Sequence, residues 1–422
     1  MILLSGADLV LPDRVLAEGT LALDGDRIAD VIHGTRSNPA PGSSAPQSVH
    51  FDLSGHYIVP GFIDVHVHGV EGTDTLDGTD AISTIAGRLP KYGVTAFCPT
   101  SLACTPGVLR TMLEAVRGAR TTRAPGGARV LPAHLESNFI NPEYKGAQPL
   151  ECLRLPRTSD LGPRTSELGP RRSDLATRTS NDEWTGDDIL REIADARPDV
   201  GIVTIASELE GALELIESLV GHGHHVSLGH SAASYGQALE GIRAGARQAT
   251  HLFNRMPPVA HRAPGLAGAV LESDDVIAEL VCDGVHVHPA MMRVAVAAKR
   301  PDRIMAITDA TAGAGLPAGS RTHIGGRPIR IADAAYLDDG TIAGSVLTMD
   351  RAFGKLTAEV GLSLSDAAVV CSTTPARALG LQGFGVISQG AMADLVVLDR
   401  DFRVVQTWIA GTLAWGAPST PV

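Results

Sequence analysis

Long apolar runs are missing from this sequence of 422 residues. No stretch approaches the roughly 20 apolar residues that a helix needs to cross a bilayer, and the first residues lack the basic and apolar regions of a secretory signal. Basic residues are in deficit, because 35 Lys and Arg stand against 47 Asp and Glu, giving a formal net charge of −12. Nucleic acid and anionic membranes are therefore disfavoured as partners, and we expect a cytoplasmic protein.

Cysteine and aromatic residues are also scarce. The five cysteines are scattered, and none belongs to a C-x-x-C pair. An odd, scattered set is typical of buried thiols in a reducing compartment rather than of disulfides or a zinc ribbon. Aromatic residues make up only 4% of the chain, whereas the 46 glycines are typical of closely packed layers of helices and strands.

What the chain does contain is a regular alternation of strand and helix patterns from residue 61 onward. Alternation of this kind favours a parallel sheet, and eight repeats favour a closed (β/α)8 TIM barrel. The eight expected barrel strands are 62–68, 94–100, 128–136, 200–207, 225–230, 248–253, 277–283 and 303–309.

The two ends of the chain read as short strands with turns between them. We expect residues 1–58 and 386–422 to form one small β-sandwich domain beside an α/β barrel domain of residues 59–385. Residues 157–181 interrupt the barrel pattern with a degenerate seven-residue repeat, RTSDLGP RTSELGP. One leucine per repeat, with Gly-Pro in the first copies, cannot build a coiled-coil seam. We therefore predict a low-complexity surface insertion, with a lid or partner-binding segment as the alternative.

The stretch PGFIDVHVHG, residues 60–69, places two histidines two positions apart in an apolar run. Side chains two apart in a strand point to the same face, so His66 and His68 are expected to lie side by side. They come at the carboxyl end of the first expected barrel strand, where barrel enzymes carry their chemistry. Two structural histidines at a strand end are the alternative, and the other strands decide between these interpretations.

Four further expected strands end in a histidine or a carboxylate. These side chains, each with its motif, are Glu136 in HLES, His230 in GHS, His251 in THLFN and Asp309 in TDAT. The carboxyl ends of barrel strands meet at one rim, so five strands deliver such groups to the same place. Imidazole and carboxylate ligands together suit a divalent ion such as zinc, iron, cobalt or manganese. The sequence therefore predicts a metal centre on this rim.

These motifs resemble the amidohydrolase superfamily and, within it, the N-acetylglucosamine-6-phosphate deacetylases. The resemblance covers nearly the whole chain outside the repeat and is strongest in PGFIDVHVHG, HLES, KGAQP, GHS, THLFN, RAPGLAG, DGVHV and TDATAGAG. It implies a hydrolase that converts N-acetyl-D-glucosamine 6-phosphate to D-glucosamine 6-phosphate and acetate. It also implies one or two divalent ions per chain, zinc first among the candidates. Glu136, His230 and His251 would hold the main ion, and His66 and His68 a second.

The same resemblance implies the roles of further residues. Asp309 would act as general base and acid beside the metal, and His286 of DGVHV would contact the substrate and polarise its carbonyl. The phosphate would bind Asn254 and Arg262, the latter reaching across the interface of an expected homodimer. The remaining residues that would line the sugar site are Ala147, Gln148, Ile342, Ala343 and Gly344.

The chain departs from the family pattern in three places. Ser137 and Asn138 follow Glu136 where the family has Gly-Pro, and a glycine there would let the backbone approach the ligand more closely. Ser207 replaces a proline after the fourth strand. Arg255 stands where a small residue is usual, and we expect it to add to phosphate binding.

Three alternatives remain open at the level of sequence. The first is the same reaction on another N-acyl hexosamine phosphate, such as the galactosamine epimer, because only one hydroxyl separates the two sugars. The second is a catalytically impaired protein on this fold, although every expected metal ligand is retained. The third, a hydrolase of an unphosphorylated amide or cyclic ureide, is disfavoured by Arg262 and the motif PGLAG.

Overall fold

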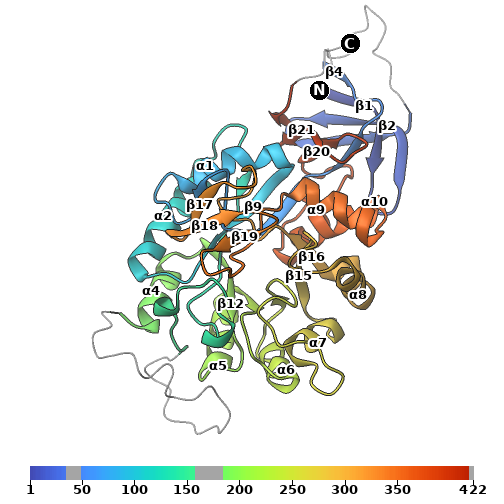
Figure 1. The fold of residues 1–422 in the computed structure, drawn as a ribbon. Helices are drawn as coiled ribbons and strands as arrows, with labels where there is room; N and C mark the ends of the chain where they lie inside the picture. Colours follow the sequence, from blue (N-terminus) through green and yellow to red (C-terminus); the bar gives the residue numbers. More distant parts are fainter. Residues whose placement is uncertain (35–48, 157–183, 418–422) are drawn as a thin grey trace, which may run out of the picture.

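The fold is known from a computed structural model that describes residues 1–34, 49–156 and 184–417. A barrel of parallel strands with helices around it makes up most of the chain, and a smaller β-domain lies against one side of the barrel (Figure 1). The repeat at 157–181, predicted to be a surface insertion, lies outside the described residues.

All the strand pairs of the barrel are parallel, as the alternating pattern predicts. Its strands are β6 (Phe62–Val67), β9 (Val94–Ser101), β10 (Arg129–Val130), β11 (Ala133–Leu135), β12 (Val200–Ile205), β13 (His225–Leu228), β14 (Gln248–Ala249), β15 (Ile277–Val281) and β16 (Ile304–Ile307). The barrel closes where the Asp309 N–H donates to the carbonyl of His66 at 3.0 Å. The eight expected strands are confirmed, with the third divided into β10 and β11.

Helices follow the strands and cover the barrel, as Figure 1 shows. Local signals start several of them: Ser234 and Gln237 form a capping box at α6, and the Thr105 hydroxyl caps α2 ahead of Pro106. The α-helices are α1 (Ala81–Arg88), α2 (Pro106–Thr121), α4 (Gly186–Asp195), α5 (Ala212–Gly221), α6 (Tyr235–Arg243), α7 (Gly265–Glu272), α8 (Pro289–Lys299), α9 (Met349–Lys355), α10 (Leu364–Ala368) and α11 (Thr374–Ala378). None of the helices in the described ranges is long and apolar enough to span a membrane.

The smaller β-domain is one mixed sheet with strands from both ends of the chain. Its strands are β1 (Ile2–Val10), β2 (Val15–Asp24), β3 (Arg27–Ile32), β4 (Val49–Asp52), β5 (Tyr57–Pro60), β20 (Leu395–Leu398), β21 (Val404–Ile409) and β22 (Thr412–Trp415). The antiparallel pairing of β5 with β20 joins the two ends of the chain. This domain has an apolar core of its own, with Trp408 and Phe51 in edge-to-face contact. The predicted fold class, a TIM barrel with a small β-domain from both chain ends, is confirmed, but this domain is a single sheet where a sandwich of two sheets was expected.

A three-stranded sheet after the eighth barrel strand was not expected from the sequence. It consists of β17 (Arg321–Ile324), β18 (Arg327–Ile331) and β19 (Ala335–Leu337), and its apolar side packs on Leu102. A short hairpin, β7 (Gly69–Val70) with β8 (Thr73–Asp74), follows β6. Both additions lie beyond the carboxyl ends of barrel strands, the end of the barrel that carries the expected metal ligands.

Candidate active site

The expected metal ligands converge on one cavity at the carboxyl ends of the barrel strands. Its volume is about 360 Å³, within the usual range of small-molecule sites. Five of the ligands line its wall, and His66 lies fully buried beneath them. The five in the wall are His68, Glu136, His230, His251 and Asp309.

One group of donors contains Glu136, His230 and His251. The Glu136 Oε1 atom lies 2.7 Å from His230 Nε2 and 2.9 Å from His251 Nε2. The two imidazole Nε2 atoms are themselves only 3.0 Å apart. All three side chains are buried, and their donor atoms face one another.

A second group contains His66, His68 and Asp309. The Nε2 atoms of the two histidines are 3.1 Å apart, and the Asp309 Oδ1 atom lies 3.3 Å from His68 Nε2 and 3.5 Å from His66 Nε2. Glu136 stands between the two groups, because its Oε2 atom is 3.6 Å from His68 Nε2. His66 and His68 therefore belong to the same site as the histidines and carboxylates at the other strand ends.

The chemistry of these donors fits divalent metal ions. The Nδ1 atom of His230 meets the carbonyl of Tyr144 at 2.8 Å, and that of His66 meets a Glu279 carboxylate oxygen at 3.0 Å. Because both partners are acceptors, Nδ1 carries the proton and Nε2 presents a lone pair in each ring. Buried lone pairs that face neighbouring nitrogens and carboxylates repel one another unless a cation lies between them. Three protein ligands are the usual number for a catalytic zinc.

The carboxylates are held in their charged form. Burial alone would raise the pKa of Glu136, but in the metal-free site a His230 ring protonated at both nitrogens outweighs burial through its charge and hydrogen bond and holds that pKa well below its usual value. Burial likewise opposes ionisation of Asp309, yet His68 and His66 lower its pKa. A charged carboxylate is the form that binds a cation or accepts a proton.

The backbone is strained at the same positions. Three of the ligands adopt positive φ angles: 48° at His230, 30° at His251 and 51° at Asp309. Non-glycine residues rarely adopt this conformation, and it concentrates at functional sites. Behind Asp309, a Cβ on Gly344 would lie only 3.0 Å from the Asp309 carbonyl oxygen, so a side chain there would push the backbone away.

The expected substrate residues lie around this centre, with one exception. Those in the cavity wall are Ala147, Gln148, Asn254, Arg255, His286, Ile342, Ala343 and Gly344. His286 is held by Asp283, whose Oδ2 atom accepts from Nδ1 at 2.6 Å, and Nε2 has no hydrogen-bond partner among the described residues. Arg262 is exposed and is not part of the cavity wall of a single chain.

Among the departures from the family pattern, Ser137 and Asn138 turn away from the cavity, whereas Arg255 lines it. Ser137 donates to the carbonyl of Thr204 at 2.5 Å, and Asn138 donates to the carbonyls of Cys104 and Cys152 at 2.8 and 2.7 Å. Both side chains are buried among these backbone groups, so Ser137 does not keep a ligand away from the rim.

Sequence reasoning missed several residues that support the centre. Gln148 was expected only as a sugar contact, yet its amide nitrogen donates to Glu136 Oε2 and its oxygen accepts from the Ala103 N–H. Glu208 accepts from the Ser231 hydroxyl at 2.5 Å, which fixes the turn after His230. Glu279 accepts from His66, as noted above. A charged residue inside the apolar stretch IAELV was the available signal for Glu279.

Fold and site together define the class of protein. The chain belongs to the amidohydrolase family, whose sequence pattern matches residues 57–414. It is similar to the N-acetylglucosamine-6-phosphate deacetylase of Bacillus subtilis (strain 168), with 30% identity over 98% of this chain and 97% of that protein. It is also similar to the N-acetylgalactosamine-6-phosphate deacetylase of Escherichia coli O157:H7, with 33% identity over 85% of this chain and 87% of that protein.

A solved structure shares the same fold. It is a mutant N-acetyl-D-glucosamine-6-phosphate deacetylase from Mycobacterium smegmatis in complex with N-acetyl-D-glucosamine-6-phosphate. The match has a TM-score of 0.81 and 31% identity, and it covers 98% of this chain and 99% of that one. The family resemblance seen in the motifs is thereby confirmed.

Proposed function

We propose that this protein is a metal-dependent deacetylase that hydrolyses N-acetyl-D-glucosamine 6-phosphate to D-glucosamine 6-phosphate and acetate. The observation that carries the proposal is the cavity in which six histidine and carboxylate side chains converge, in a chain whose relatives bear this activity in their names. We propose zinc as the metal, held by Glu136, His230 and His251, with a second ion at His66, His68 and Asp309.

A divalent ion at this site supplies Lewis-acid polarisation and lowers the pKa of a bound water. The residues of the chain supply the proton transfers and the orientation. Asp309, charged and exposed to the cavity, accepts a proton from the attacking water and returns it to the departing amine. His286 faces the cavity, and in the ring protonated at both nitrogens Nδ1 donates to Asp283 while Nε2 donates to the acetamide carbonyl.

Arg255 and Asn254 are the proposed phosphate contacts. Arg255 lines the cavity wall, and a Cβ built on Gly146 would lie 2.6 Å from the Arg255 Nε atom. Gly146 of the KGAQP loop thus leaves the room that the Arg255 guanidinium occupies. A guanidinium supplies the paired N–H donors that a phosphate accepts, which an otherwise acidic protein needs at this point.

The proposal extends to the assembly and the compartment. We propose a homodimer in which Arg262, outside the cavity of its own chain, reaches the site of the partner subunit. The five cysteines are all buried, and Cys98, Cys104, Cys282 and Cys371 are free thiols, which supports a reducing compartment such as the cytoplasm. We also propose that residues 59–385 form the catalytic domain and that residues 1–58 with 386–422 form the β-domain.

Acetate release from a panel of N-acetyl sugars tests the proposal. We expect turnover of N-acetylglucosamine 6-phosphate to exceed that of unphosphorylated N-acetylglucosamine by orders of magnitude. The galactosamine epimer is the second candidate substrate, because one relative is named for it. Activity on neither sugar phosphate, in protein loaded with zinc, would contradict the proposal.

Variants of the two arginines test the phosphate site. Arg255→Ala should raise KM for the phosphorylated sugar at least tenfold and leave the unphosphorylated sugar unaffected. Arg262→Ala should also raise KM for the phosphorylated sugar, but only if the protein forms a dimer. Light scattering on the same sample measures the oligomeric state. Equal KM values for Arg255→Ala and wild type would remove Arg255 from the site.

A further inference from the structure

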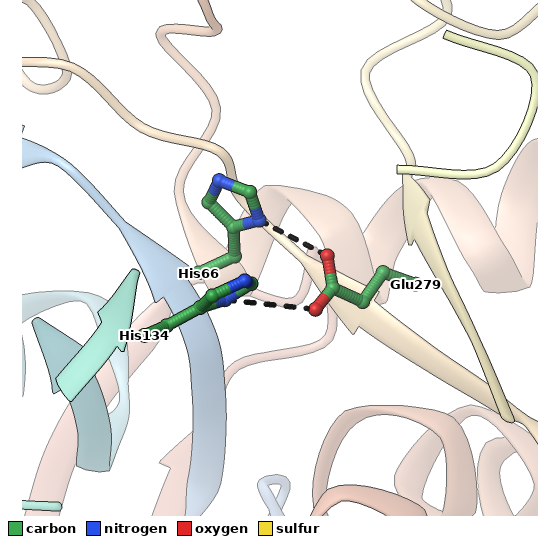
Figure 2. Close-up of side chains that lie close together, drawn as sticks. All are labelled: His66, His134 and Glu279. Atoms are coloured by element: carbon green, nitrogen blue, oxygen red, sulfur yellow. Dashed lines mark hydrogen bonds and ion pairs between the residues drawn. The ribbon is translucent and has the colours of Figure 1, made fainter. Parts of the chain in front are cut away.

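The His66 ring lies between the rim and a buried carboxylate. Its Nε2 atom faces His68 and Asp309, and its Nδ1 atom lies 3.0 Å from Glu279 Oε2 on β15 (Figure 2). Neither His66 nor Glu279 is exposed to solvent. The two residues are 213 positions apart in sequence, so only the closed barrel brings them together.

Glu279 is poorly satisfied as a structural group. Besides His66, the one donor to its Oε2 atom within residues 1–34, 49–156 and 184–417 is the His251 N–H, at a long 3.3 Å. Its Oε1 atom has no hydrogen-bond partner in the described part of the chain and lies 3.7 Å from His134 Nδ1. That imidazole instead donates to the Val65 carbonyl at 3.0 Å. Burying a carboxylate with so few partners lowers the free energy of unfolding. Glu279 must therefore contribute to function rather than to stability.

We propose that Glu279 is a positioning residue that holds His66 in the tautomer protonated at Nδ1 and thereby presents the Nε2 lone pair to a second metal ion. The inference rests on the proposed metal-dependent function. An ionised carboxylate can only accept a hydrogen bond, so it selects the Nδ1–H tautomer. Carboxylates that bond metal-binding histidines in this way orient the ring and raise its basicity.

The other metal-binding histidines lack such a partner. His230 is oriented by a backbone carbonyl, and the Nδ1 atoms of His68 and His251 are buried without a hydrogen-bond partner among the described residues. Within this centre, a carboxylate therefore orients His66 alone. Loss of Glu279 should weaken the second ion and leave the ion at Glu136, His230 and His251 in place.

Titration of metal-free protein with Zn²⁺ tests the proposal without measuring turnover. In wild type we expect two binding events per chain. Glu279→Leu removes the acceptor and should weaken one event by 10- to 100-fold, the usual effect of losing a residue behind a metal ligand. Glu279→Gln keeps an amide oxygen that can accept the same hydrogen bond, and it should retain most of the affinity.

Gln248→Leu is the matched control. Gln248 lies on the adjacent strand β14, is equally buried and also has a side-chain oxygen without a hydrogen-bond partner among the described residues. It should bind both ions as wild type does. Thermal unfolding of the metal-free variants checks that each is folded, and we expect no loss of stability in Glu279→Leu.

Several results would overturn the proposal. One is a single bound Zn²⁺ in wild type, and another is unchanged Zn²⁺ affinity in Glu279→Leu. The others are a loss of Zn²⁺ affinity in Glu279→Leu that is matched by the Gln248→Leu control or by Glu279→Gln. A wild-type protein that binds two ions but releases no acetate would instead contradict the proposed function and leave this inference standing.

Discussion

Replacing Asp309 by asparagine removes the negative charge of the side chain and keeps its shape. The side chains are nearly isosteric, and asparagine also tolerates the positive φ of 51° found at this position. The main-chain bonds that close the barrel here, Asp309 N–H to His66 and Ser345 N–H to Asp309, do not involve the side chain. We therefore expect the fold to be kept, with a loss in the free energy of unfolding of about 1 to 3 kcal/mol from the weakened contact of this side chain with His68.

The effect on catalysis should be far larger. A positioned general acid or base contributes about 10²- to 10⁴-fold in rate, which corresponds to about 3 to 5 kcal/mol in activation free energy. The amide cannot accept a proton, so both the activation of water and the protonation of the amine are lost. Because these interactions arise in the transition state, kcat and kcat/KM should fall together while KM changes little.

Acetate release measured with saturating substrate and zinc gives kcat directly. The matched control is Asp199→Asn, which neutralises a buried aspartate that binds Arg117 at 2.7 Å and does not line the cavity. Its kcat should stay close to that of wild type. If Asp309→Asn kept kcat within tenfold of wild type at equal metal content, Asp309 would not be the general base.

Three further outcomes follow from the geometry. The double variant His66→Ala/His68→Ala should lose about one metal ion per chain by elemental analysis, and an unchanged metal content would make this pair structural. Glu136→Gln should lose nearly all bound metal and all turnover, because Glu136 contacts both groups of donors. Burial lowers the pKa of Lys299 from 10.5 to about 8, so the unfolded chain binds more protons at this residue between these values, and the free energy of unfolding of wild type should rise with pH relative to that of Lys299→Met across that window. Urea denaturation of both proteins across the window measures this difference, and a difference that did not grow with pH would contradict the assignment to Lys299. The buried cysteine thiols, whose pKa values burial raises, act in the opposite direction but equally in both proteins.

The sequence alone determined the barrel and most of its rim. Apolar strands alternating with capped helices are local signals, and each expected strand needed only its own residues to form. The third strand divides at Pro132, which cannot donate a ladder hydrogen bond, so even this break was present in the sequence. Parallel strands place their carboxyl ends together, and that rule brought His66 and Asp309 to one site before any contact was known.

Tertiary structure decided which side chains meet behind that rim. The contact of Glu279 with His66 joins the first and the seventh strand of the barrel, 213 residues apart in sequence, and no local signal specifies it. The turn of Ser137 and Asn138 away from the cavity depends on which carbonyls from distant segments lie within reach. Local propensity fixes where a strand begins and ends. The partner of a buried polar group is set instead by the register of the closed barrel, because only packing determines which polar groups meet in an interior from which water is excluded.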